Sequence, residues 1–191
     1  MGFRLIPIFI KSKALKSDEE ILKMVGLPNL EKGKTFDFYD TNKQWDSVFI
    51  GTKDICKILC NGELASKAFK DENPFLNFED TEIASIIWDE TSSVYGFSLI
   101  KNGKTIRKVL VSDGEFEYDY GEPIPEELEI NEDEIFIPEE KEEIIEGEGE
   151  EAFQEMMKAE KVCRVADTLA KRYIGAGVVG IQERIELNEY E

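Results

Sequence analysis

The stretch VYGFSLIKNGKTIRKVLV, residues 94–111, carries the strongest local signal for the fold. Asn102-Gly103 separates two β-rich runs, and this dipeptide favours a two-residue type I′ turn because both of its positions need a positive φ. We therefore predict a hairpin of two antiparallel strands. The turn sets the facing pairs across this hairpin, which are Leu99 with Ile106 and Tyr95 with Leu110.

Strand signals on both sides extend the hairpin into a larger unit. Residues 82–89 are apolar and β-rich, and Ser112-Asp113-Gly114 forms a second turn before an alternating run at residues 115–120. Each of these runs is joined to the next by a short turn, which is typical of antiparallel neighbours. We predict a four-strand antiparallel meander over residues 82–120.

Further strand and helix signals lie outside the meander. Ser17 and Glu20 match a capping box, and Gly26 ends the helix that follows. Residues 151–174 give the strongest helix signal, because small and apolar residues recur at alternating spacings of four and three. Weaker signals predict strands at residues 3–10, 48–50 and 55–59 and a short helix at residues 63–69.

These signals predict an α+β fold: an antiparallel sheet with a four-strand meander, short helices, and a long C-terminal helix packed on it. We expect three parts. Residues 1–121 form an α+β globular domain, residues 122–150 an acidic arm or linker, and residues 151–191 the C-terminal helix with a short tail packed on the domain. The middle part is expected to be extended, because glutamate dominates it and Pro123, Pro125 and Pro138 interrupt it.

The net charge of the chain lies in one segment. Residues 113–155 contain 20 Asp and Glu and one basic residue, Lys141. The remaining residues contain 22 acidic and 22 basic side chains, so this segment accounts for the formal net charge of −19. Concentrated negative charge attracts cationic surfaces or divalent ions and repels nucleic acid and anionic membranes. We therefore predict a basic protein partner, no nucleic acid and no membrane.

Two groups of carboxylates are the candidate binding residues. The first alternates with Phe116, Tyr118 and Tyr120, so a regular strand would place these carboxylates on one face and the aromatic rings on the other. The spacing fits no EF-hand loop. The second group lies in the acidic arm. The two groups are Asp113, Glu115, Glu117 and Asp119 on the strand, and Glu139, Glu140, Glu142 and Glu143 in the arm.

The chain contains no histidine, which excludes Ser–His and Cys–His nucleophilic sites and zinc sites that need imidazole. Cys56 and Cys60 have a C-x₃-C spacing and no companion ligands, so we expect both, and Cys163, to be buried core residues. No metal site is predicted. Three cysteines favour a reducing compartment, and we expect a cytoplasmic protein.

Gly175-Ala176-Gly177-Val178-Val179-Gly180 matches the glycine pattern of dinucleotide-binding sites. In those sites a strand leads into the glycines and a helix begins after them. Here the glycines follow a predicted helix instead. We interpret Gly175 as the end of that helix, followed by a short strand, and we predict no cofactor.

From about Val48 to Pro123 the chain resembles an uncharacterised bacterial domain family of unknown function. The matching residues are Tyr95-Gly96-Phe97, Asn102-Gly103, Ile106-Arg107, Asp113-Gly114 and Gly121-Glu122-Pro123-Ile124-Pro125, with a weaker match at Ile55-Cys56-Lys57-Ile58-Leu59-Cys60. In that family the strand before the hairpin often carries histidine, whereas Ile86-Ile87-Trp88-Asp89-Glu90 has none. The resemblance implies the fold of this part and no function.

Two functional hypotheses follow. The first is a non-enzymatic binding or regulatory module that uses an acidic surface. The second is a small histidine-free enzyme of the hydrolase type that uses paired carboxylates, with or without a divalent ion. Two carboxylates that converge on one concave cavity would favour the enzyme, whereas carboxylates spread over a convex surface would favour the binding module.

Overall fold

A single antiparallel sheet forms the centre of the molecule. The computed structural model describes residues 4–14, 16–43, 46–70, 73–178 and 184–191. Their ten strands have the order β3-β10-β4-β5-β2-β6-β7-β8-β9, and the short β1 pairs with β6. The strands are β1 (Arg4–Leu5), β2 (Pro7–Ser12), β3 (Lys32–Asp37), β4 (Val48–Lys53), β5 (Cys56–Cys60), β6 (Thr81–Asp89), β7 (Val94–Lys101), β8 (Lys104–Ser112), β9 (Glu115–Tyr120) and β10 (Glu186–Tyr190).

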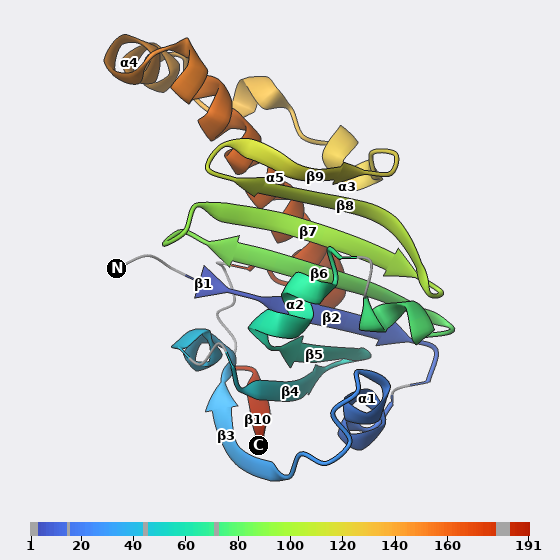
Figure 1. Cartoon of the computed structure of the whole chain (residues 1–191). Coiled ribbons are helices and arrows are strands. Elements are labelled where there is room, and N and C mark those ends of the chain that lie inside the picture. Colours follow the sequence, from blue (N-terminus) through green and yellow to red (C-terminus); the bar gives the residue numbers. More distant parts are fainter. Residues whose placement is uncertain (1–3, 15, 44–45, 71–72, 179–183) are drawn as a thin grey trace.

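Helices cover both faces of this sheet. The long α5 crosses one face, while α1 and α2 lie on the other (Figure 1). The α-helices are α1 (Asp18–Met24), α2 (Gly62–Lys67), α3 (Pro125–Leu128), α4 (Pro138–Glu148) and α5 (Glu150–Ile174). The 3₁₀ turns in the described residues are η1 (Phe38–Lys43), η2 (Pro74–Asn77) and η3 (Glu132–Glu134).

Alternation along the strands separates two hydrophobic cores. On one face, Phe9 and Phe97 pack in a cluster with Leu169 of α5. On the other, Ile8 and Ile83 belong to a second cluster that includes residues of α1 and α2. Neighbouring strand residues point to opposite faces, so each central strand contributes to both cores. The predicted α+β fold, with short helices and a long C-terminal helix on the sheet, is confirmed.

The predicted meander is present as β6-β7-β8-β9. Asn102 and Gly103 have φ values of 49° and 70°, as the two-residue turn requires. The predicted register is wrong by one residue beyond the turn, because Leu99 pairs with Arg107 rather than Ile106, and Tyr95 with Val111 rather than Leu110. The register shifts between Leu99 and Ile100, which makes Ile106 the extra residue of a β-bulge.

The local helix signals correspond to real helix ends. The Ser17 hydroxyl accepts a hydrogen bond from the Glu20 backbone N–H, and the Glu20 carboxylate accepts one from the Ser17 backbone N–H. Gly175 ends α5 in the left-handed region, at φ 75°. Val179 and Gly180 of the glycine pattern lie outside the described residues.

Two strands had no clear sequence signal. β3 has the sequence Lys-Gly-Lys-Thr-Phe-Asp, and its first four residues are exposed. β10, near the C-terminus, inserts between β3 and β4 and pairs with both. The segment after α5 therefore supplies a strand within the sheet as well as packing on it.

Residues 122–150, called the acidic segment from here on, contain helices where we expected an extended arm. The segment contains α3, η3 and α4, and that expectation of its conformation was wrong. Pro125 and Pro138 occupy the first turns of α3 and α4. Proline is favoured there because its fixed φ suits a helix and its missing N–H would have no partner in the helix. The division of the chain at residues 121 and 150 remains a prediction.

Candidate functional site

The start of the acidic segment is attached to the sheet by Arg107 of β8. Its Nε and Nη2 atoms donate to the two carboxylate oxygens of Glu127 in α3, at 2.8 and 2.7 Å. Its Nη1 atom donates to Asp119 at 2.5 Å and to the carbonyl oxygen of Gly121 at 3.0 Å. The side chains of Arg107 and Glu127 are 7% and 11% exposed. Bidentate, charge-assisted bonds of this kind are strong and orient both partners.

The β-bulge explains why Arg107 lies inside. It leaves Ile106 41% exposed and turns Arg107 inward, where only 6% of its surface remains accessible. The hydrogen bonds to Glu127 are the main cause that raises the pKa of the Arg107 guanidinium, so the charged form is favoured. Glu127 also accepts a hydrogen bond from the Ile124 backbone N–H at 2.9 Å, which caps the start of α3.

A second arginine binds the neighbouring glutamate of α3. Arg172, near the end of α5, donates to Glu126 at 2.7 Å and to Glu82 of β6 at 2.5 Å. The Tyr173 hydroxyl donates to the same Glu82 at 3.0 Å, and burial raises the pKa of that hydroxyl. One oxygen of Glu126 is buried without a hydrogen-bond partner. Arg107 of β8 thus holds Glu127 of α3, and Arg172 of α5 holds the preceding Glu126.

The chain stays against α5 for one more stretch after α3. Glu132 pairs with Lys161, and Arg164 donates to the carbonyl oxygen of Ile135 at 3.1 Å. The ring of Phe136 lies 5.6 Å from that of Phe153, measured between centroids. We call residues 122–137 the docked half of the acidic segment.

The second half of the segment is α4, which projects beyond the sheet (Figure 1). None of its residues is buried, and the candidate residues Glu139, Glu140, Glu142 and Glu143 are exposed. Among the described residues, no basic side chain forms an ion pair with a glutamate of α4. Its one lysine, Lys141, lies over the Phe153 ring at 5.1 Å. In the described ranges, the negative charge of α4 is therefore not neutralised by ion pairs.

The candidate carboxylates of β9 do not share one face. The one-faced arrangement expected for a regular strand is therefore wrong. Pairing with β8 shifts between Leu110 and Val111, and this bulge makes Glu117 the extra residue of β9. Phe116 and Asp119 face α5, whereas Glu117 and Tyr118 line a pocket on the opposite side. Asp113 and Glu115 are exposed at and beside the turn.

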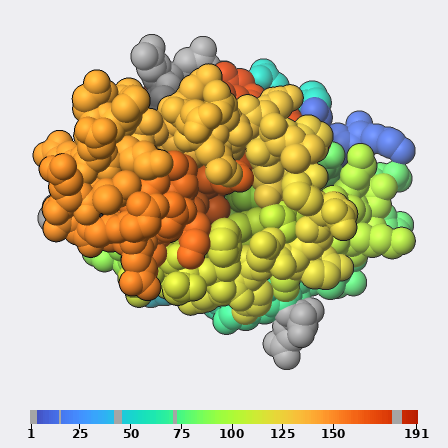
Figure 2. Space-filling model, turned by 90° about the horizontal axis from the view of Figure 1, so that it is seen from above, coloured from blue at the N-terminus to red at the C-terminus, as the bar shows by residue number. Residues whose placement is uncertain are grey.

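A cleft of about 410 Å³ lies between β8-β9, the docked half and α5. Figure 2 shows it as a hollow between the yellow atoms of β9, the gold atoms of the docked half and the orange atoms of α5. Phe97, Val109 and Val162 form apolar lining, and Lys158 lies at the side. Asp119 and Glu127 converge here, but both accept hydrogen bonds from Arg107. This carboxylate pair therefore serves to fix the acidic segment.

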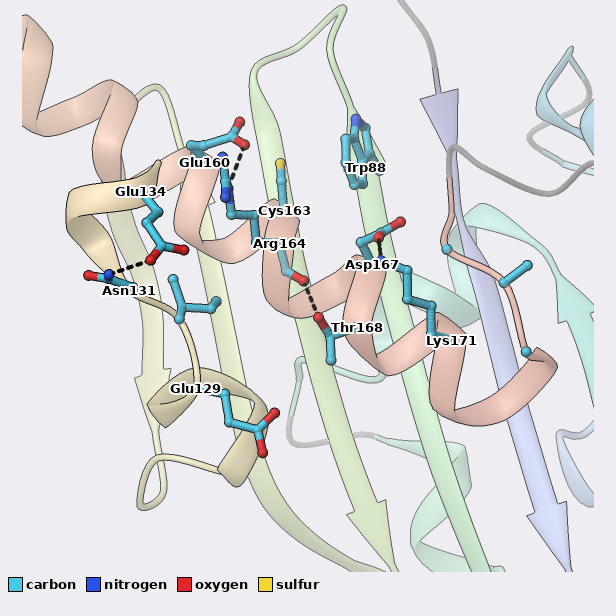
Figure 3. A pocket seen from close by; sticks show the side chains of 14 residues that line it. Trp88, Glu129, Asn131, Glu134, Glu160, Cys163, Arg164, Asp167, Thr168 and Lys171 are labelled. Carbon is cyan, nitrogen blue, oxygen red and sulfur yellow. Dashed lines mark hydrogen bonds and ion pairs between the residues drawn. The ribbon is translucent and has the colours of Figure 1, made fainter. Parts of the chain in front are cut away.

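A larger and more open cavity of about 920 Å³ runs along α5 (Figure 3). At this cavity Arg164 pairs with Glu160 and Lys171 with Asp167, and Glu134 accepts a hydrogen bond from Asn131. Glu129 also lines it and is exposed. Burial raises the pKa of the Cys163 thiol, which disfavours a reactive thiolate. None of the candidate carboxylates from the sequence lines this cavity.

The cysteines are free and buried, as expected from the sequence. Burial raises the pKa of Cys56 and that of Cys60 to about 12. Within the described ranges, no three His, Cys, Asp or Glu side chains are grouped as metal ligands. No helix that the structure describes is long and apolar enough to cross a membrane.

No protein-family model, curated protein or solved structure matches this chain. The resemblance over residues 48–123 therefore remains a prediction.

Sequence reasoning missed the residues that hold the acidic segment: Arg107, Arg172, Glu126 and Glu127. One signal was present, because Ile-Pro-Glu-Glu occurs at residues 124–127 and again at residues 137–140. Proline followed by two acidic residues is typical of a helix start. The two Ile-Pro-Glu-Glu sequences are identical, however, so they do not show which of them binds arginine.

Proposed function

We propose that this chain is a non-enzymatic binding or regulatory module whose exposed helix α4 binds a basic protein partner. One observation carries the proposal. Three acidic side chains of the docked half, Glu127, Glu126 and Glu132, pair with Arg107, Arg172 and Lys161 of the same chain. The six glutamates of α4, by contrast, form no ion pair among the described residues. An unneutralised cluster of this kind steers a cationic partner toward it.

Neighbouring carboxylates extend the same negative region. The turn between β8 and β9 lies against α5, because Gly114 contacts the side chain of Glu155. Asp113 and Glu115 are exposed at this turn, and Glu150 and Glu151 begin α5 directly after α4. This field disfavours nucleic acid and anionic membrane surfaces, so the proposed partner is a protein. Unpaired, buried thiols support a reducing compartment, and we propose the cytoplasm.

The hydrolase hypothesis needs paired carboxylates that are available to a substrate. In the cleft, Asp119 and Glu127 converge, and a fixed arginine occupies both. Of the carboxylates that line the larger cavity, Glu160 and Asp167 pair with Arg164 and Lys171, and Glu134 accepts a hydrogen bond from Asn131. A carboxylate already bound to a buried guanidinium is poorly suited to remove or donate a proton. This geometry favours the binding module over the enzyme.

The test is capture from a lysate of cells that naturally produce this chain, with mass spectrometry of the bound proteins at low and high salt. The bait is compared with the quadruple variant Glu139→Gln, Glu140→Gln, Glu142→Gln and Glu143→Gln. A matched control removes four exposed carboxylates elsewhere: Glu31→Gln, Glu79→Gln, Glu122→Gln and Glu129→Gln.

We expect a basic protein that the unmodified chain and the control retain at low salt, and that high salt or the α4 variant releases. Exposed charges contribute little to stability, so the α4 variant should fold normally. Retention of the same proteins by the α4 variant at both salt concentrations would contradict the proposal.

A further inference from the structure

The two outermost strands of the sheet are β3 and β9. In the described part of the chain, β3 pairs only with β10 and β9 only with β8. Each strand has six residues. The outer edge of such a strand presents backbone N–H and C=O groups without a partner in the sheet, and a strand of another molecule can pair with them.

The side chains at the two edges have opposite charge. β3 exposes Lys32 and Lys34, and β9 exposes Glu115, Glu117 and Asp119. β9 also exposes two aromatic rings, with Phe116 46% and Tyr120 54% accessible.

Lysine already meets these rings within the chain. Lys108 lies 5.8 Å from the centre of the Tyr120 ring, and Lys158 lies 5.8 Å from that of Phe116. A lysine-bearing strand therefore fits both the carboxylates and the rings of β9.

We propose that β9 of one copy pairs with β3 of a second copy, which continues the sheet from molecule to molecule. Pairing β9 with another β9 would place carboxylates opposite one another, and pairing two β3 strands would do the same with lysines. Only the mixed pair brings together opposite charges. It joins different surfaces, so the contact is head-to-tail. This inference is independent of the proposed partner of α4.

The net charge of −19 opposes any association between copies. Salt screens this long-range repulsion, with a Debye length of about 8 Å at physiological ionic strength. Adjacent lysines and carboxylates in a paired strand are closer than this and keep more of their attraction. We therefore expect weak assembly that increases with protein concentration at physiological salt.

Sedimentation equilibrium of the full chain, up to millimolar concentration, tests the proposal with two variants. The Lys32→Glu/Lys34→Glu variant makes both edges acidic. The Glu115→Lys/Glu117→Lys variant makes β9 basic and leaves Asp119 bound to Arg107. Thermal unfolding followed by circular dichroism is the check that each variant retains its fold.

The unmodified chain should show a mass that rises with concentration, and each variant alone should lose this rise. An equimolar mixture of the two variants should recover it, because an acidic β3 then meets a basic β9. An unmodified chain that stays monomeric throughout would overturn the proposal. So would variants that assemble as well as the unmodified chain, or a mixture of folded variants that fails to associate.

Discussion

The sequence Ile-Pro-Glu-Glu starts two helices in this molecule, and the two copies have opposite surroundings. In both, the second glutamate accepts a hydrogen bond from the isoleucine backbone N–H: Ile124 donates to Glu127, and Ile137 donates to Glu140. Yet Glu126 and Glu127 bind arginines, whereas Glu139 and Glu140 are exposed. Local sequence therefore determines where a helix starts, and distant partners determine whether its charge is available.

The largest difference should appear when Glu127→Ala is compared with Glu140→Ala. Both variants lose the same helix-capping acceptor, so the cap contributes equally. Glu127→Ala also leaves Arg107 buried with less compensation, and breaking a buried pair costs about 3 kcal/mol or more. Glu140→Ala should cost about 1 kcal/mol or less, as for an exposed cap. Urea denaturation gives both free energies of unfolding.

A second buried-pair variant separates charge from packing. Replacing both partners, as Arg107→Met/Glu127→Leu, removes the uncompensated charge and should be less destabilising than Glu127→Ala. Equal free energies of unfolding for Glu127→Ala and Glu140→Ala would show that Arg107 does not hold the acidic segment.

Glycines at the two ends of the segment give a smaller contrast. Gly121 has φ 90°, and a Cβ atom there would lie 2.1 Å from the carbonyl oxygen of Ile106. Gly121→Ala should therefore cost at least about 1 kcal/mol from backbone strain alone. At Gly147 in α4, a Cβ atom would have no atom within 4 Å apart from its chain neighbours and the nearby backbone of its own helix. Gly147→Ala should raise the helicity of α4, because glycine has about 1 kcal/mol lower helix propensity than alanine. Melting midpoints and circular dichroism distinguish the two.

The smallest expected difference between the two halves is the free energy of local opening. Limited proteolysis with a glutamate-specific protease should detect it. Both halves offer glutamates, but the docked half is held by ion pairs and α4 has no buried residue. We expect the first cuts within residues 138–149, with residues 122–137 cut later. Mass spectrometry of the early fragments locates the cuts, and a first cut in the docked half would reverse the assignment.

The parts of the fold that depend on local sequence could be predicted. Asn102-Gly103 specified the meander, and Ser17 with Glu20 specified the start of α1. The register could not be predicted, because the bulge at Ile106 turns Arg107 toward Glu127, 20 residues away along the chain. β10, which lies between the edge strand β3 and β4, was also missed, because these partners lie far from it in sequence.

The candidate site, too, could be predicted only where it depends on local sequence. Composition located the negative charge, and α4 carries the predicted exposed glutamates. The one-faced arrangement on β9 failed because a single extra residue, Glu117, shifts the alternation. The glutamates of α3 could not be told from those of α4, since only the arginines supplied by β8 and α5 distinguish them.

The central claim is that a basic partner binds the six glutamates of α4, which form no ion pair in the described part of the chain. A ¹H–¹⁵N NMR titration of the full chain with a lysine oligomer at physiological salt tests it directly. Chemical-shift changes should centre on residues 138–148 and disappear in the variant with Gln at positions 139, 140, 142 and 143. Changes centred on residues 122–137, or unchanged binding by that variant, would contradict the account.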